Sequence, residues 1–255
     1  MKRFLLVIMM ITTIKAFGIF GFGIHAGVDN TSVDKLNIQA FEFSVAGDTY
    51  SYSLTRDEIS NPFVFGGQVY LDIPLVPIGF EADFEASWAE YKWTAPANLT
   101  GLGTATDIPL EFTGYDAGAT GYSEDFSFGR FSTDFTAKWY VFGFPPVVKI
   151  FSFYVGGGAG FHFITPLVSE DLIIDELTKK YNSSGFTGSS ELDIEELVKS
   201  SVSMGYHIVT GARIKFPVLP VAFNVDYKYT WTEENDYGDP TNNFGMFKGS
   251  VSLYF

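Results

Sequence analysis

The chain has 255 residues, of which 18% are aromatic, and a formal net charge of −14 at pH 7. That length suffices for one substantial barrel or two small domains, and the acidity argues against nucleic acid or anionic phosphate as partners. The chain has no cysteine, which excludes disulfides, thiol catalysis and thiolate metal sites.

Residues 1–18 are typical of a secretory signal peptide. Two basic residues, Lys2 and Arg3, precede an apolar core, and residues 16–18 (Ala-Phe-Gly) provide a small-x-small cleavage site. The core of about 11 apolar residues is too short to span a bilayer as a helix. We therefore expect a signal peptide at 1–18 and an exported domain at 19–255.

The exported region contains eight segments in which apolar and polar side chains alternate. Between Phe80 and Phe84, for example, aromatic and small apolar residues alternate with Glu81 and Asp83. A period of two is typical of a β-strand with two unlike faces. Most segments exceed the roughly 9–11 residues that cross a bilayer at a tilt. The expected strands are residues 19–28, 61–73, 78–89, 130–141, 149–163, 201–216, 221–231 and 244–255.

Short and long connections alternate between these strands. The short turns contain proline, which cannot donate to a sheet ladder, and lie at residues 72–78, 142–147 and 215–221. The long connections hold 23 of the 30 acidic residues and lie at residues 29–60, 95–125, 164–200 and 232–243. Short periplasmic turns opposite long external loops are typical of an outer-membrane barrel.

The first long connection leaves the strand number open. Residues 35–45 and 49–54 could form a further hairpin, which would raise the count to ten strands. The second arm is short, however, and the first slips phase near Ala40 and Phe41, whereas a spanning strand keeps its register. We expect this hairpin to lie above the membrane and keep ten strands as the alternative.

Helical spacing of apolar residues appears in the third long connection. Residues 169–181 and 191–200 show this spacing, with acids near each start and lysines near each end, which suits the helix dipole. We expect two helices that cap the barrel mouth, with a partner-binding or gating lid as the alternative.

The polar strand faces carry equal numbers of acidic and basic residues in an otherwise acidic chain. Buried charge is tolerated only when it is paired and hydrogen-bonded, so this balance indicates ion pairs enclosed in the barrel lumen, with glycines making room for long side chains. The expected network is Asp72, Glu81, Asp83, Glu85, Arg130, Asp134, Lys138, Arg213, Lys215, Asp226, Lys228 and Lys248.

The apolar faces are then expected to contact lipid. Aromatic residues near the strand ends suggest interfacial girdles. They are Trp88, Tyr91, Trp93, Trp139, Phe142, Tyr229 and Trp231. A lipocalin-like barrel would show a similar period with the faces reversed.

The last strand ends on an aromatic residue of its apolar face, which carries Val251, Leu253 and Phe255. It resembles the closing strand of bacterial outer-membrane barrels, and the chain resembles the small eight-stranded barrels of the OmpX, OmpW and OmpA-transmembrane type. The resemblance implies an outer-membrane location, contact with lipid and lipopolysaccharide, and recognition of Val251, Leu253 and Phe255 by the outer-membrane assembly machinery.

No catalytic, metal or cofactor site is expected. His25, His162 and His207 face the interior by parity, but His162 and His207 differ in height by on the order of 10 Å along the barrel axis, too far for a shared metal. His162 has no recognisable nucleophile motif beside it. The glycine run at 156–160 lacks the helix and Lys-Ser/Thr of a phosphate loop.

These patterns predict a non-enzymatic barrel with a structural or surface-interaction role. An eight-stranded barrel has an interior just wide enough for side chains, so an open pore is not expected. The acidic loops could bind divalent cations and so bridge to lipopolysaccharide phosphates. The alternative is a narrow channel for small or hydrophobic solutes, as the OmpW-type resemblance implies.

Overall fold

A computed structural model describes residues 20–45, 47–73, 76–113, 116–118, 121–144, 150–165, 167–168, 170–184, 190–192, 201–216, 219–233 and 243–255. The expected signal peptide at 1–18 lies outside the described residues, as do residues 145–147 of the second proline turn and residues 234–242. No described helix is long and apolar enough to cross a membrane.

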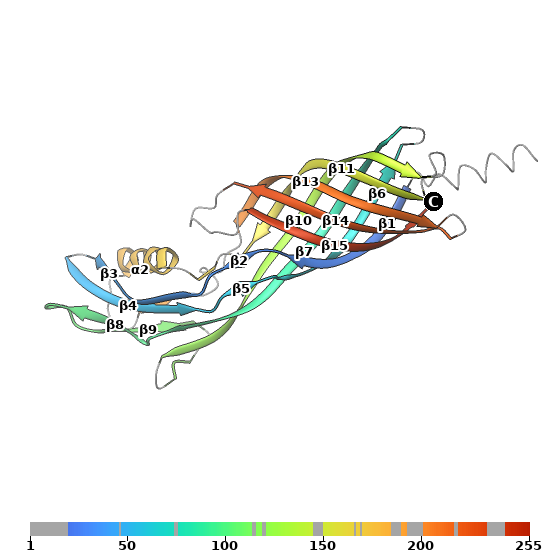
Figure 1. Cartoon of the computed structure of the whole chain (residues 1–255). Coiled ribbons are helices and arrows are strands. Elements are labelled where there is room, and N and C mark those ends of the chain that lie inside the picture. The colour runs from blue at the N-terminus through green and yellow to red at the C-terminus, as the bar shows by residue number, and fades with distance from the viewer. Residues whose placement is uncertain are drawn as a thin grey trace, which may run out of the picture.

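Eight long antiparallel strands close into a ring (Figure 1). They are β1 (Phe20–Asp29), β6 (Phe63–Asp72), β7 (Ile78–Ala95), β10 (Tyr122–Phe144), β11 (Phe151–Ile164), β13 (Ser201–Phe216), β14 (Val221–Thr232) and β15 (Asn243–Tyr254). Each pairs with the next, and β15 returns to β1, where Gly21 lies opposite Tyr254. The predicted eight-stranded antiparallel barrel is confirmed, and its closure leaves no unpaired edge in the ring.

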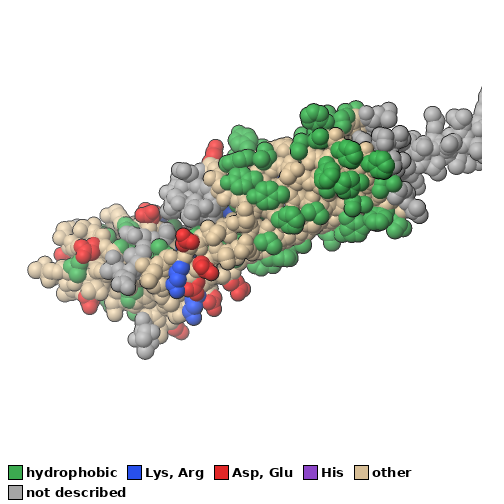
Figure 2. Space-filling view, viewed as in Figure 1, with side chains coloured by type: hydrophobic (Ala, Val, Ile, Leu, Met, Phe, Trp, Pro, Cys, Tyr) green, Lys and Arg blue, Asp and Glu red, His purple; other side chains and the backbone are tan. Residues whose placement is uncertain are grey.

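The alternation along each ring strand directs apolar side chains outward and charged side chains inward. Phe84 and Phe153 are 53% and 50% exposed, whereas Arg130 and Asp134 are fully buried. In Figure 2 the hydrophobic side chains gather over the ring half of the molecule. The lipocalin-like arrangement, with an apolar interior, is therefore wrong.

The ring continues at one end into a second folded part, which we call the extramembrane unit. Strands β7 and β10 run on past the ring, and shorter elements join them (Figure 1). These are β2 (Ser32–Val33), β3 (Leu36–Val45), β4 (Asp48–Arg56), β5 (Ile59–Ser60), β8 (Asn98–Leu102), β9 (Ile108–Phe112), β12 (Ser190–Leu192) and α2 (Glu170–Ser184).

The β3–β4 hairpin belongs to this unit and not to the ring. Strand β4 pairs with β7 only through Thr55 opposite Thr94 and Arg56 opposite Trp93, beyond the level at which β6 leaves β7. The hairpin lies outside the ring, so the ten-strand alternative is wrong, and its position above the membrane stays a prediction. The register between β3 and β4 shifts between Ile38 and Phe41, where the sequence changes phase.

A hydrophobic core holds the extramembrane unit together, although its sequence reads as polar connections. Leu54, Trp93 and Leu99 are almost completely buried and pack with Leu177 of α2. The prediction of Tyr91 and Trp93 as girdle residues is wrong, because both side chains point into this core. The extension of β7 beyond the ring carries them above the lipid-facing belt.

Only the first of the two expected helices lies in the described residues. Helix α2 matches the predicted segment at 169–181. At 190–192 the chain instead forms β12, which pairs in parallel with β9, so the predicted start of the second helix at residue 191 is wrong. The remainder of that segment lies outside the described residues.

Candidate functional site

The lumen of the ring is the candidate site, because all twelve predicted charged residues lie inside it and each makes an ion pair. Ring strands point alternate residues inward, so charges two residues apart form successive levels. We distinguish three levels along the barrel axis: a turn-side tier, a middle tier and an outer pair.

The turn-side tier lies next to the short turns. Arg213 Nη1 lies 3.0 Å and Lys215 Nζ 2.8 Å from Asp72 Oδ2, while Lys138 Nζ lies 2.5 Å from Glu81 Oε1. Asp226 completes the tier, 4.0 Å from Lys138. Three carboxylates thus face three cations.

Three acids and two lysines make up the middle tier. Lys228 donates to Asp134 Oδ2 at 2.5 Å and also to Glu85. Lys248 donates to Glu85 and lies 3.5 Å from Asp83. These five residues come from β7, β10, β14 and β15, so the tier crosses the lumen from wall to wall.

The outer pair joins Asp29 to Arg130. Asp29 also accepts hydrogen bonds from Thr31 Oγ1 at 2.6 Å and Ser87 Oγ at 3.0 Å, and the Arg130 guanidinium lies 3.5 Å from the centre of the Phe244 ring. By sequence, Asp29 falls in the first long connection, at residues 29–60. The parity of His25 would have identified it as inward-facing.

Two histidines that were expected to lie far apart converge on one carboxylate oxygen. His207 Nδ1 and His162 Nε2 lie 3.4 Å and 3.7 Å from Asp134 Oδ1. The expected height difference is therefore wrong. Gly160 on β11 lies opposite Asp134 and Gly158 opposite His207, and without side chains there the groups on β10 and β13 meet across β11.

An apolar cluster covers the lumen beyond the outer pair. Phe128, two residues before Arg130 on the inward face of β10, is fully buried with Ile59 and Ile164. Arg56 donates from Nη1 to the Val168 carbonyl at 3.1 Å, which ties the segment before α2 to this cluster. Among the described residues, charges fill the lumen and hydrophobic side chains close its outer end.

The outer wall has the opposite character. Its exposed side chains are almost all apolar, and the girdle residues Trp88, Trp139, Phe142 and Trp231 are between 43% and 60% exposed. A closed ring with an ionic interior and an apolar exterior satisfies its backbone polar groups internally and suits hydrocarbon. The ring is therefore an eight-stranded β-barrel with the surface character of a membrane-spanning barrel.

Comparisons with known proteins find structural neighbours of low sequence identity. No protein-family model and no curated protein matches the sequence. The β-barrel domain of Pseudomonas aeruginosa OprF shares 12% identity over 93% of this chain and 99% of its own, with a TM-score of 0.41. Neisserial surface protein A shares 14% identity over 92% of this chain and 97% of its own, with a TM-score of 0.41. Pseudomonas aeruginosa OprG shares 13% identity over 94% of this chain and 95% of its own, with a TM-score of 0.39. Values this low support no functional inference.

The closing strand presents its predicted assembly residues to lipid. Val251, Leu253 and Phe255 are 43%, 39% and 60% exposed on the outer wall, while β15 pairs with both β14 and β1. Their recognition by the assembly machinery stays a prediction.

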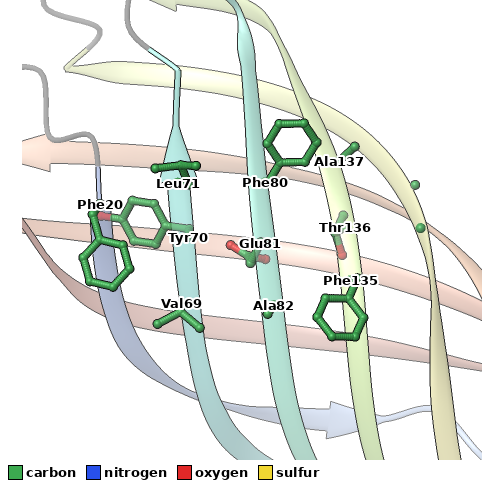
Figure 3. Close-up of a pocket in the computed structure, with 12 residues that line it drawn as sticks. Phe20, Val69, Tyr70, Leu71, Phe80, Glu81, Ala82, Phe135, Thr136 and Ala137 are labelled. Atoms are coloured by element: carbon green, nitrogen blue, oxygen red, sulfur yellow. The ribbon is translucent and has the colours of Figure 1, made fainter.

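A groove of about 460 Å³ interrupts the apolar wall near the turn side (Figure 3). Phe20, Phe80 and Phe135 surround the small side chains of Ala82 and Ala137. The lining side chains of the lipid-facing parity are apolar, whereas Tyr70, Glu81 and Thr136, which also line the groove, belong to the inward face.

Proposed function

We propose that this protein is a sealed, non-enzymatic outer-membrane barrel that anchors an acidic extramembrane unit for contacts at the cell surface. The observation that supports a sealed barrel is that three successive levels of paired charges cross the lumen beneath the apolar cluster. The three histidines lie within this lumen, where no substrate has access, and this favours a role without catalysis.

The extramembrane unit supplies the interacting surface in this proposal. Its described acidic residues include Glu42, Asp57, Glu90 and Glu111, all exposed, and Figure 2 shows acidic and basic side chains where the apolar belt ends. Carboxylate oxygens are preferred ligands of divalent cations. Cations held there would link the unit to lipopolysaccharide phosphates at the same level of the membrane.

Conductance in planar bilayers tests the sealed lumen. We expect the refolded wild-type protein to give no current steps, because the paired charges leave no continuous aqueous path. Reproducible steps whose size changes in Arg213→Gln or Asp83→Asn would contradict this and favour a narrow channel.

Lipid vesicles with and without lipopolysaccharide test the surface role. We expect Ca²⁺ to raise the thermal unfolding temperature of the extramembrane unit only when lipopolysaccharide is present, and EDTA to reverse the effect. The same rise in vesicles of phospholipid alone would contradict the bridge to lipopolysaccharide.

A further inference from the structure

The described lumen carries one more negative than positive formal charge when its histidines are neutral. Seven carboxylates face six lysine or arginine cations. The carboxylates are Asp29, Asp72, Glu81, Asp83, Glu85, Asp134 and Asp226, and the cations are Arg130, Lys138, Arg213, Lys215, Lys228 and Lys248.

Counted by ion-pair contacts, the imbalance falls in the middle tier. The turn-side tier has three acids and three bases, and the outer pair has one of each. In the middle tier, the described ion pairs of Asp83, Glu85 and Asp134 with lysines go to Lys228 and Lys248, while Lys138 of the turn-side tier also acts on Asp83 from a greater distance. An uncompensated charge in a buried site is costly because neither water nor a counter-ion stabilises it.

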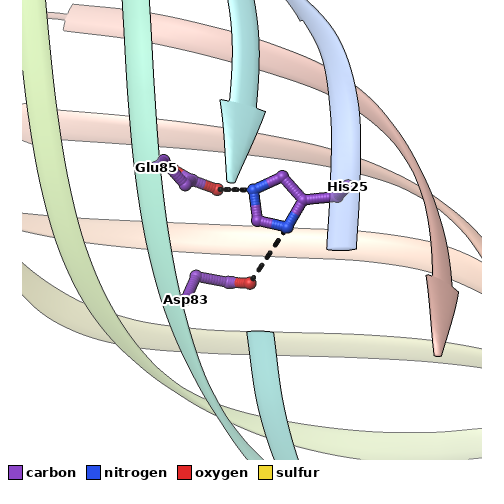
Figure 4. Close-up of side chains that lie close together, drawn as sticks. All are labelled: His25, Asp83 and Glu85. Carbon is purple, nitrogen blue, oxygen red and sulfur yellow. Dashed lines mark ion pairs between the residues drawn. The ribbon is translucent and has the colours of Figure 1, made fainter. Parts of the chain in front are cut away.

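All three histidines of the chain surround this tier. Their side chains are at most 4% exposed. His207 and His162 approach Asp134 Oδ1 at 3.4 Å and 3.7 Å. His25 lies between Asp83 and Glu85, with a nitrogen 3.9 Å from an oxygen of each (Figure 4). The imidazoles therefore gather where a positive charge is missing.

We propose that the middle tier is a binding site for one proton, held between His207, His162 and Asp134. The second nitrogen of each ring already has a hydroxyl partner, since His207 Nε2 lies 2.8 Å from Thr136 Oγ1 and His162 Nδ1 lies 2.8 Å from Ser132 Oγ. A protonated ring donates from both nitrogens, one to the hydroxyl and one toward Asp134.

The charged groups on the neighbouring strands agree with a single proton. Lys228 of β14 and Glu85 of β7 face the two rings from the far side of Asp134, and Arg130 lies toward the outer end. One proton makes the tier neutral. A second would leave it positive beside Lys228.

The grouping of His25, Asp83 and Glu85 also resembles a divalent-metal site, because one ligand atom from each lies within 4.8 Å of the others. Lys248 opposes a metal there, since it donates to Glu85 and lies 3.5 Å from Asp83. A divalent ion would also reverse the charge of the tier. The tier needs one positive charge to become neutral, and one proton on an imidazole supplies it.

Nuclear magnetic resonance of ¹⁵N-histidine in the full exported chain, refolded in micelles, tests the proposal. Imidazolium and neutral rings have distinct nitrogen shifts. We expect close to one imidazolium per chain at pH 7, its loss in Asp134→Asn, and a second imidazolium in Lys248→Met, which removes a cation from the tier. Glu81→Gln, in the turn-side tier, is the matched control and should retain the signal.

Three neutral rings in the folded wild type would overturn the proposal, as would loss of the imidazolium in Glu81→Gln. A stoichiometric metal whose removal by chelator shifts the ring signals would overturn it too. Heat-modifiable gel mobility reports folding of each variant. If Asp134→Asn does not fold, Lys248→Met decides, because an unchanged imidazolium count there contradicts the local imbalance. The inference goes beyond the proposed surface role and does not depend on it.

Discussion

At the scale of single residues, the interior of this barrel depends on two kinds of position: charges that must be paired and glycines that make room for them. Arg130 and Asp134 are fully buried and are paired with Asp29 and Lys228 respectively. Removal of one partner from such an ion pair costs much more than removal of both. The glycines of β11 have a matching role, because a side chain at Gly160 would collide with Asp134.

The outer pair offers a direct measurement of the cost of an unpaired buried charge. We expect Asp29→Ala to lower the free energy of unfolding by about 3–5 kcal/mol, because Arg130 is left uncompensated. Urea unfolding in lipid vesicles gives the value. Lys35→Ala is the control, since its pair with Asp57 is exposed and such pairs contribute about 0–1 kcal/mol. Equal effects of the two changes would contradict the buried pair.

The glycines of the lumen wall can be tested one at a time. A methyl group at Gly158 would lie 1.8 Å from the Phe135 carbonyl oxygen, whereas one at Gly249, an outward-facing control position, meets no atom within 4 Å. We therefore expect Gly158→Ala to reduce the yield of folded barrel severalfold and Gly249→Ala to leave it unchanged. Heat-modifiable gel mobility after refolding measures both, and a normal yield for Gly158→Ala would show that the wall adjusts.

At the scale of elements, the long strands β7 and β10 belong to two environments. Their ring portions alternate between lipid and lumen, and their extensions alternate between solvent and the core of the extramembrane unit. The period of two continues where β7 passes from the ring into the extramembrane unit. The sequence therefore shows which face of the strand carries Tyr91 and Trp93, but not that this face meets a protein core there. The β3–β4 hairpin and α2 were predictable from local pattern, whereas β8, β9 and β12 have too few residues to show one.

Alkaline pH should loosen the extramembrane unit before the barrel. Burial raises the pKa of Tyr52, whose hydroxyl donates to the Pro96 carbonyl at 3.1 Å. The folded unit therefore favours the neutral tyrosine, so this stability is present below pH of about 10, where an unfolded tyrosine ionises, and is lost as the pH rises further.

Limited proteolysis at pH 8 and pH 11 measures this loss. We expect cleavage within the unit to accelerate at pH 11, and less so in Tyr52→Phe, which costs about 1 kcal/mol at neutral pH through its lost hydrogen bond. An identical acceleration in both proteins would assign the alkaline effect to other groups.

At the scale of the whole molecule, the ring is joined end to end with the extramembrane unit (Figure 1). The outer wall of the ring is apolar, and the unit carries exposed acidic residues. The ring requires hydrocarbon around it, and the unit requires water. The two parts differ because the ring exposes its apolar side chains, whereas the extramembrane unit buries its apolar side chains in a core.

Because the chain has no cysteine, single cysteines can carry an environment-sensitive fluorophore without background labelling. We expect labels at Phe84→Cys, Phe153→Cys and Phe223→Cys to report an apolar environment, since these side chains are 45–53% exposed on the outer wall. Ser44→Cys, on the exposed face of β3, is the control and should report water. Water at the three ring positions would contradict the membrane-spanning ring.

The sequence by itself determined the eight ring strands, their inward and outward faces, and the charged residues that the lumen would contain, because a period of two is a local property of the extended chain. Tertiary structure alone decided which charges meet. Closure of the ring brings β7 opposite β14 and β15, and glycines on β11 let Asp134 reach two histidines. It also decided that the acidic connections fold around a core, because their apolar residues are too dispersed along the chain to show which of them pack together.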